Sequence, residues 1–92
     1  MREKNVEIYL REQIKKLGGI AIKFVSPGNA GVPDRIVLLS WGECIFVELK
    51  APRKKTTALQ NRQIERIQKL GFRVEILDST DRVDEFIENL KG

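Results

Sequence analysis

Three charged side chains, placed in two short motifs, could carry out chemistry together. Asp34 closes the motif Gly31-Val32-Pro33-Asp34, and Glu48 and Lys50 lie two residues apart at the end of a later apolar run. A pair of carboxylates can hold a divalent cation, and an ammonium group beside them can orient a water molecule and offset the charge of a phosphate. Together these groups are suited to metal-dependent phosphodiester hydrolysis.

The sequence contains no histidine and a single cysteine, Cys44. This composition excludes Ser-His-Asp hydrolases, nucleases that bind their metal through histidine, and zinc sites with nitrogen and sulfur ligands. Acid–base chemistry must then use carboxylates, lysine, Tyr9 or a metal-bound water. Oxygen ligands favour Mg²⁺, Mn²⁺ or Ca²⁺, so we expect any metal to be one of these.

A length of 92 residues allows one small domain with a single core, and we expect that domain to span residues 1–92. The net charge of +4 is a mild bias toward polyanionic partners. One cysteine cannot form an internal disulfide, which fits a reducing compartment. We find no signal peptide and no apolar run near the ~20 residues of a membrane span, so we expect a cytoplasmic protein with no membrane partner.

Hydrophobic periodicity predicts the element order αβββαβα. The predicted helices cover residues 2–17, 58–70 and 80–90, and the predicted strands cover residues 20–25, 35–39, 44–50 and 72–77. The strand, helix and strand within residues 44–77 should form a right-handed parallel crossover that follows an antiparallel hairpin. The predicted fold class is therefore α/β, with a central mixed sheet of about four strands flanked by helices.

The hairpin turn decides whether Asp34 and Glu48 meet. Side chains alternate along a strand, so Glu48 and Lys50 share a face and could simply form an ion pair at the strand end. A three-residue loop over residues 40–42, with Gly42 in the left-handed conformation, would place Asp34 directly across from Glu48. Two carboxylates that close repel each other unless a cation or a proton lies between them. A two- or four-residue loop would separate them.

Three blocks of sequence carry a resemblance to a known family. They are Gly31-Val32-Pro33-Asp34-Arg35, Phe46-Val47-Glu48-Leu49-Lys50-Ala51-Pro52 and Leu59-Gln60. In this order they resemble the VRR-NUC (virus-type replication-repair nuclease) domain of the PD-(D/E)xK, restriction-endonuclease-like superfamily. The likeness spans nearly the whole chain, and the extended blocks are far more specific than the bare motif. The resemblance implies a restriction-endonuclease-like core, Mg²⁺ or Mn²⁺ as cofactor and no nucleotide cofactor.

The resemblance also implies roles for the motif residues. Asp34, Glu48 and the backbone carbonyl of Leu49 would bind the metal. Lys50 would orient or help deprotonate the attacking water and offset charge on the scissile phosphate. These roles agree with the chemistry that the residue types allow.

Two further positions have competing explanations. The family places a helical glutamate near the metal, and we match it to Glu7 as a catalytic residue and possible metal ligand. Glu3, one turn earlier, competes for this role, and Glu7 could also be a surface acid near the helix start. Gln60 is the expected catalytic glutamine, although Thr57 and Gln60 also fit a capping box; both roles can hold at once.

Basic and polar residues near the motif could contact phosphates on either side of the cut. We expect this role for Lys23, Ser26, Asn29, Arg53, Lys54, Lys55 and Arg62. A charged run is usually a solvated surface, but its adjacency to the motif favours phosphate contact here. Trp41, at the predicted hairpin tip, fits either a partner-facing anchor or the rim of the core.

The leading hypothesis is a divalent-metal-dependent DNA endonuclease. So small a domain has little surface for reading bases, which favours recognition of branched DNA, a flap or four-way junction, over a sequence. Symmetric cutting of duplex or branched DNA needs two copies, so we expect a homodimer. The expected setting is phage or mobile-element replication or repair in the host cell cytoplasm.

Two other function classes compete with a nuclease. A non-catalytic nucleic-acid-binding module could keep the nuclease fold, but it would be free to lose Asp34, Glu48 or Lys50. A small protein-interaction domain would explain Trp41, but it leaves a like-charged pair on one sheet face unexplained.

Overall fold

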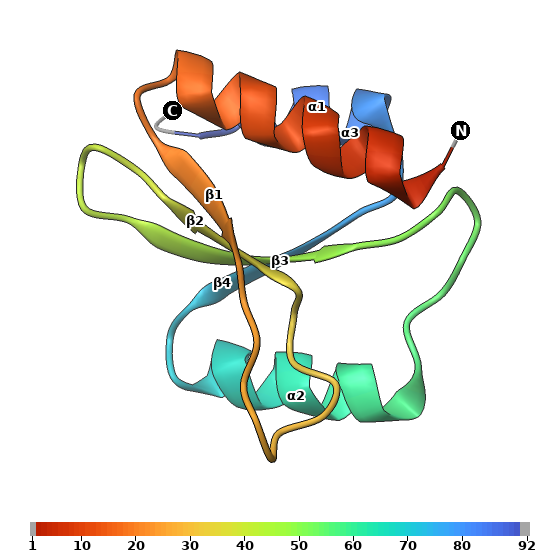
Figure 1. The fold of residues 1–92 in the computed structure, drawn as a ribbon. Coiled ribbons are helices and arrows are strands. Elements are labelled where there is room, and N and C mark those ends of the chain that lie inside the picture. Colours follow the sequence, from red (N-terminus) through yellow and green to blue (C-terminus); the bar gives the residue numbers. More distant parts are fainter. Residues whose placement is uncertain (1, 91–92) are drawn as a thin grey trace.

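A computed structural model describes residues 2–90 of the chain (Figure 1). The helices are α1 (Glu3–Lys16), α2 (Ala58–Lys69) and α3 (Thr80–Glu88), and the strands are β1 (Ile20–Lys23), β2 (Arg35–Leu38), β3 (Cys44–Leu49) and β4 (Arg73–Leu77). The predicted order αβββαβα is confirmed. Element ends agree with the prediction to within two residues, and the differences arise because periodicity does not mark the last hydrogen-bonded residue. Residues 1, 91 and 92 of the predicted domain lie outside the described residues.

The strands form one mixed sheet in the order β1-β2-β3-β4. β2 pairs antiparallel with both β1 and β3, whereas β3 pairs parallel with β4. α2 provides the crossover from β3 to β4, which is needed because parallel strands cannot be joined by a tight turn. The α/β class with a four-stranded mixed sheet is therefore the predicted one.

The two faces of the sheet are covered unequally. α1 and α3 lie on one face and α2 lies on the other (Figure 1). The main core lies beneath α1 and α3 and includes Val6, Leu10, Ile14, Val37, Ile45, Val47, Val83 and Phe86. On the α2 face, Ile20 and Leu38 are 53% and 41% exposed. No helix within residues 2–90 is long and apolar enough to cross a membrane.

The turn between β2 and β3 has the predicted three-residue form. The Leu39 N–H donates to the Glu43 carbonyl at 2.9 Å, and the Gly42 N–H donates to the Leu39 carbonyl at 3.0 Å. Gly42 has a φ of +88°, a conformation that glycine adopts without steric cost. This closure sets the register of the whole hairpin, in which Arg35 lies opposite Val47.

Candidate active site

Asp34 and Glu48 lie opposite each other at one end of the sheet. The register that pairs Arg35 with Val47 continues by one residue to place Asp34 across from Glu48. Val47 belongs to the core beneath α1 and α3, so the alternation of side chains directs Glu48 to the α2 face. The predicted register is thereby confirmed, and directly opposed Cβ atoms are typically ~5 Å apart.

Glu48 is the buried acid of this site, with 4% of its surface exposed. Its Oε2 lies 3.7 Å from Lys50 Nζ and accepts a hydrogen bond from Gln60 Nε2 at 3.1 Å. Both contacts use the same carboxylate oxygen, Oε2, and a hydrogen bond from the Asp34 backbone lowers the pKa of the same group. The ion pair that was the alternative explanation of Glu48 and Lys50 is therefore present, and it lies inside the candidate site.

Gln60 connects this carboxylate to the start of α2. Its Oε1 accepts from the Thr57 N–H at 2.9 Å, while Thr57 Oγ1 accepts from the Gln60 N–H at 3.1 Å. This is a complete capping box. The side-chain amide remains available for Glu48, so Gln60 starts the helix and contacts the site at the same time.

Asp34 is held by the backbone of β3. Its Oδ1 accepts a hydrogen bond from the Leu49 N–H at 3.1 Å. Extended two residues beyond the pair of Arg35 and Val47, the hairpin register sets Leu49 opposite Pro33, which has no N–H to donate to the Leu49 carbonyl. Pro33 therefore deprives this carbonyl of its usual ladder partner, at the position predicted to supply a metal ligand.

Burial raises the pKa of both carboxyl groups. Burial is the main cause for Glu48 and the charge of Asp34 the second; Lys50 opposes them, and the resulting pKa is about 7. Burial also raises the pKa of Asp34, against the hydrogen bond from Leu49, which lowers it. The pair can therefore take up either a proton or a cation near neutral pH.

The glutamates of α1 divide between the site and the sheet. The negative charge of Glu3 contributes to the raised pKa of both Asp34 and Glu48. Glu7, the residue matched to the family's helical glutamate, instead forms an ion pair with Arg35. Glu3 therefore adds its charge to the field at the two site carboxylates, whereas the contact described for Glu7 is with Arg35. Periodicity could not separate the two, because residues four apart lie on the same side of a helix.

Arg35 has a positioning role that no sequence pattern assigned. Besides its ion pair with α1, its guanidinium donates to the Ala21 carbonyl of β1 at 3.5 Å. Its positive charge also opposes the rise in the pKa of Asp34. Its place directly after Asp34 was the one available signal. Tyr9 serves the fold elsewhere, since its hydroxyl donates to Asp84 of α3 at 2.6 Å.

The loop between β1 and β2 packs against α2 (Figure 1). Gln63 Nε2 donates to the Ala30 carbonyl at 3.2 Å. Gly31 has a φ of +90°, and a Cβ atom at this position would lie 2.9 Å from Leu59 Cγ. The close approach that glycine permits here is therefore to a helix, and it fixes the distance between the Asp34 segment and α2.

The polar residues predicted to contact DNA before the motif lie on β1 and the following loop. Lys23 pairs with Arg35 in the sheet register. Asn29 Nδ2 donates to Ser26 Oγ at 3.0 Å, so these two side chains also shape the loop.

The basic loop after β3 contains a turn with unusual geometry. The Lys54 N–H donates to the Ala51 carbonyl at 3.0 Å, Pro52 occupies the second position, and Arg53 has a φ of +69°. This is a type II turn with an arginine where glycine is preferred. Arg53, Lys54 and Lys55 are exposed, and Arg62 is exposed on α2, two residues from Gln60 and on the side away from the sheet.

The oxygen donors of the site fit a cation that is completed by water and substrate. Within residues 2–90, no cluster of three or more carboxylate or thiolate side chains could hold a metal. Mg²⁺ in phosphoryl chemistry commonly uses one or two carboxylates together with waters and phosphates. Asp34, Glu48 and the Leu49 carbonyl match that pattern.

Known proteins share both the sequence and the fold of this chain. The family model of the VRR-NUC domain matches residues 2–81. A protein of Acyrthosiphon pisum secondary endosymbiont phage 1, named "Putative nuclease p44", is 52% identical over 81 residues, which cover 88% of this chain and 87% of that protein. A solved structure described as a VRR_NUC domain superposes with a TM-score of 0.89 at 36% identity and covers 96% of each chain. The chain belongs to the VRR-NUC family.

Proposed function

We propose that this domain is a Mg²⁺- or Mn²⁺-dependent DNA endonuclease selective for branched DNA. Its family and its identity to a phage protein named as a nuclease support phosphodiester hydrolysis. One observation carries the metal dependence: Asp34 and Glu48 are opposed, and burial raises the pKa of each. A divalent cation bound between the two carboxylates offsets the cost of ionising them side by side in a buried site.

Each site residue would have its own role in this reaction. A cation held by Asp34, Glu48 and the Leu49 carbonyl would supply an acidified water and positive charge for the phosphate. Lys50 carries a positive charge 3.7 Å from Glu48 and can hold the scissile phosphate or the attacking water beside the pair. Gln60 fixes the orientation of Glu48 through its hydrogen bond.

The finer features of the proposal rest on size and surface. A domain of 92 residues with one site offers little surface for reading bases, which favours DNA shape over sequence. Cutting two strands symmetrically requires a homodimer. The half-exposed Ile20 and Leu38, neighbours on the sheet face that α2 covers incompletely, support a second copy there. The phage origin of the relative supports a role in phage DNA replication or repair.

A cleavage assay tests the proposal. Purified protein is incubated with Mg²⁺, Mn²⁺ or EDTA and with labelled linear duplex, single strand, flap and four-way junction. We expect metal-dependent cleavage of a branched substrate by the wild type and loss of cleavage in Glu48→Gln and Lys50→Ala. Glu65→Gln, which removes an exposed carboxylate on the outer side of α2, is the matched control and should cut normally.

Two outcomes would contradict the proposal. Retarded migration of DNA on a gel without cleavage in any metal would favour the non-catalytic binding module. Cleavage that persists in EDTA, or in Glu48→Gln, would exclude the metal site described above.

A further inference from the structure

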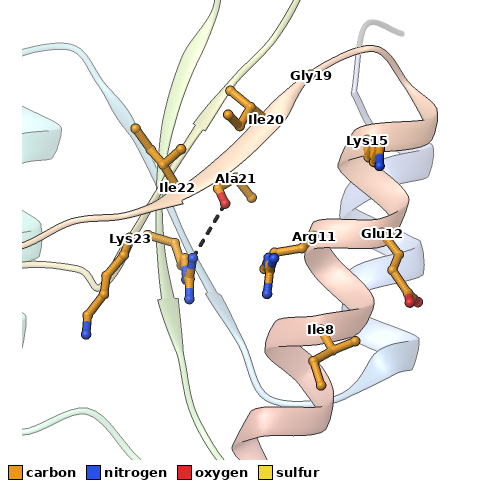
Figure 2. Close-up of a pocket in the computed structure, with 10 residues that line it drawn as sticks. Ile8, Arg11, Glu12, Lys15, Gly19, Ile20, Ala21, Ile22 and Lys23 are labelled. Carbon is orange, nitrogen blue, oxygen red and sulfur yellow. Dashed lines mark hydrogen bonds between the residues drawn. The ribbon is translucent and has the colours of Figure 1, made fainter.

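A groove lies between α1 and the free edge of β1, on the side of the sheet opposite α2 (Figure 2). Its volume is about 680 Å³. Four cationic side chains line it, and Glu12 is the one acid among its lining residues in the described part of the chain; the cations are Arg11, Lys15, Lys23 and Arg35. Asp34, Glu48, Lys50 and Gln60 are not among its lining residues.

Most of this positive charge is not neutralised by the protein. Arg35 is ion-paired with Glu7, but within residues 2–90 Arg11, Lys15 and Lys23 form no ion pair. Arg11 extends from α1 toward β1, whereas Glu12 points away from the strand (Figure 2). Arg11 and Lys15 are one helical turn apart, a rise of ~6 Å, so they form a row along the groove.

The edge of β1 adds hydrogen-bond donors to this row. The Phe24 N–H donates to the Asp34 backbone carbonyl at 2.8 Å, so the even-numbered residues of the strand bond to β2. The alternation of an antiparallel ladder then turns the N–H groups of Ala21 and Lys23 toward the groove. The Ala21 carbonyl on the same edge already accepts from Arg35 (Figure 2). The groove therefore presents cationic side chains and backbone hydrogen-bond donors, while the Ala21 carbonyl, an acceptor on this edge, already binds Arg35.

We propose that this groove binds the sugar-phosphate backbone of a DNA arm other than the one that is cut. The inference rests on the proposed nuclease function and names how the branched substrate is held. Lys23 lies opposite Arg35, which directly follows Asp34, so the groove begins at the end of the sheet that carries the site, on the opposite face, and Arg11 and Lys15 lead away from that end. The basic loop from Arg53 starts on the other side of the site, after β3. Two separate basic surfaces diverging from one site suit two arms of a branch.

Competing occupants fit the same features less well. An acidic peptide that adds a strand to β1 would need the Ala21 carbonyl as an acceptor, and Arg35 occupies it. A second copy paired edge to edge through β1, unlike one docked on the sheet face at Ile20 and Leu38, would bring two sets of like charges together. A phosphate backbone has only acceptors and negative charge, so it matches what the groove presents.

Charge reversal in the groove tests this inference. The double variant Arg11→Glu/Lys15→Glu changes two exposed side chains, and the control Lys16→Glu/Lys69→Glu makes the same change in net charge at exposed positions outside the groove. Binding to a labelled four-way junction and to one of its arms as a linear duplex is measured by anisotropy in EDTA over a salt series. Circular dichroism melts establish that both variants fold.

We expect the groove variant to bind the junction at least tenfold more weakly than the control. The slope of log K against log salt should fall by about 2, for two lost phosphate contacts. Binding to the linear duplex should fall to the same extent in both variants. Equal junction binding by the two variants would overturn the inference. It would also be overturned if a labelled acidic decapeptide lost affinity for the groove variant while the junction did not.

The same proteins separate this inference from the proposed nuclease function. If the protein cleaves DNA with metal but the groove variant binds the junction as well as the control does, only the inference about the groove is refuted. If the groove variant binds the junction more weakly but no protein cleaves DNA with any metal, the nuclease function is refuted and the inference about the groove stands.

Discussion

The side-chain amide of Gln60 donates to Glu48 Oε2 at 3.1 Å while its carbonyl oxygen accepts from the Thr57 N–H. One residue thus joins the start of α2 to the most buried carboxylate of the site. Because the capping box and the site share Gln60, the position of the helix and the orientation of Glu48 depend on each other.

Variants at Thr57 and Gln60 should separate these two roles. Thr57→Ala removes the capping side chain and should cost about 1 kcal/mol of unfolding free energy with cleavage retained. Gln60→Ala removes the cap partner and the contact with Glu48, so we expect a similar loss of stability and a further ~10-fold or greater loss of activity. Urea denaturation and single-turnover cleavage measure the two effects. Equal activities in both variants would reduce Gln60 to a capping residue.

The metal-free protein should lose stability as the pH rises. The pKa of Glu48 is raised from 4.5 to about 7, so the folded state holds its proton more tightly than the unfolded chain. The stabilisation is complete below pH 4.5, declines between pH 4.5 and about 7, and is absent above. Asp34, whose pKa is also raised, adds to this decline.

Thermal melts in EDTA from pH 4 to 9 measure this decline, with Glu48→Gln as the reference. The difference between the wild type and this variant isolates Glu48 from other titrating groups. Saturating Mg²⁺ should restore the stability of the wild type above pH 7, because the cation favours the ionised carboxylates. A melting temperature that changes with pH equally in both proteins would contradict the assignment.

Glu3 and Glu7 should differ in what their loss changes. Glu3→Gln should weaken Mg²⁺ binding, because its charge reaches both site carboxylates, with little change in stability. Glu7→Gln breaks the ion pair between α1 and Arg35 and should cost about 1–2 kcal/mol of unfolding free energy. Calorimetric titration of Mg²⁺ and urea denaturation measure the two quantities. A loss of Mg²⁺ affinity in Glu7→Gln alone would return the role to Glu7.

Arg53→Gly should raise the free energy of unfolding and lower the affinity for DNA. Arg53 has a φ of +69°, which costs an L-residue about 1 kcal/mol and glycine much less. Removal of the guanidinium should at the same time weaken DNA binding by the basic loop. Arg53→Asn is the control, because asparagine tolerates the same conformation. It removes the charge without adding the backbone freedom of glycine. Unchanged DNA affinity in both variants would show that Arg53 makes no phosphate contact.

Short-range patterns predicted the part of the site that lies on the hairpin. Gly42 determines a three-residue turn, the turn determines the register, and the register places Asp34 opposite Glu48. These steps depend only on residues near one another in the chain, where backbone sterics and strand alternation act. Pro33 belongs to the same local logic, because a missing N–H is a property of the residue itself.

Tertiary packing decided which helix residues reach the site. Glu3 and Glu7 are equivalent by periodicity, but the placement of α1 on the sheet lets Glu7 form an ion pair with Arg35. The capping box was visible in the sequence, but the reach of Gln60 to Glu48 depends on how the β1–β2 loop docks on α2 through Gly31. The groove beside β1 likewise exists only once α1 lies along a sheet edge. Such features arise from elements distant in sequence, whose relative placement depends on packing of the whole core.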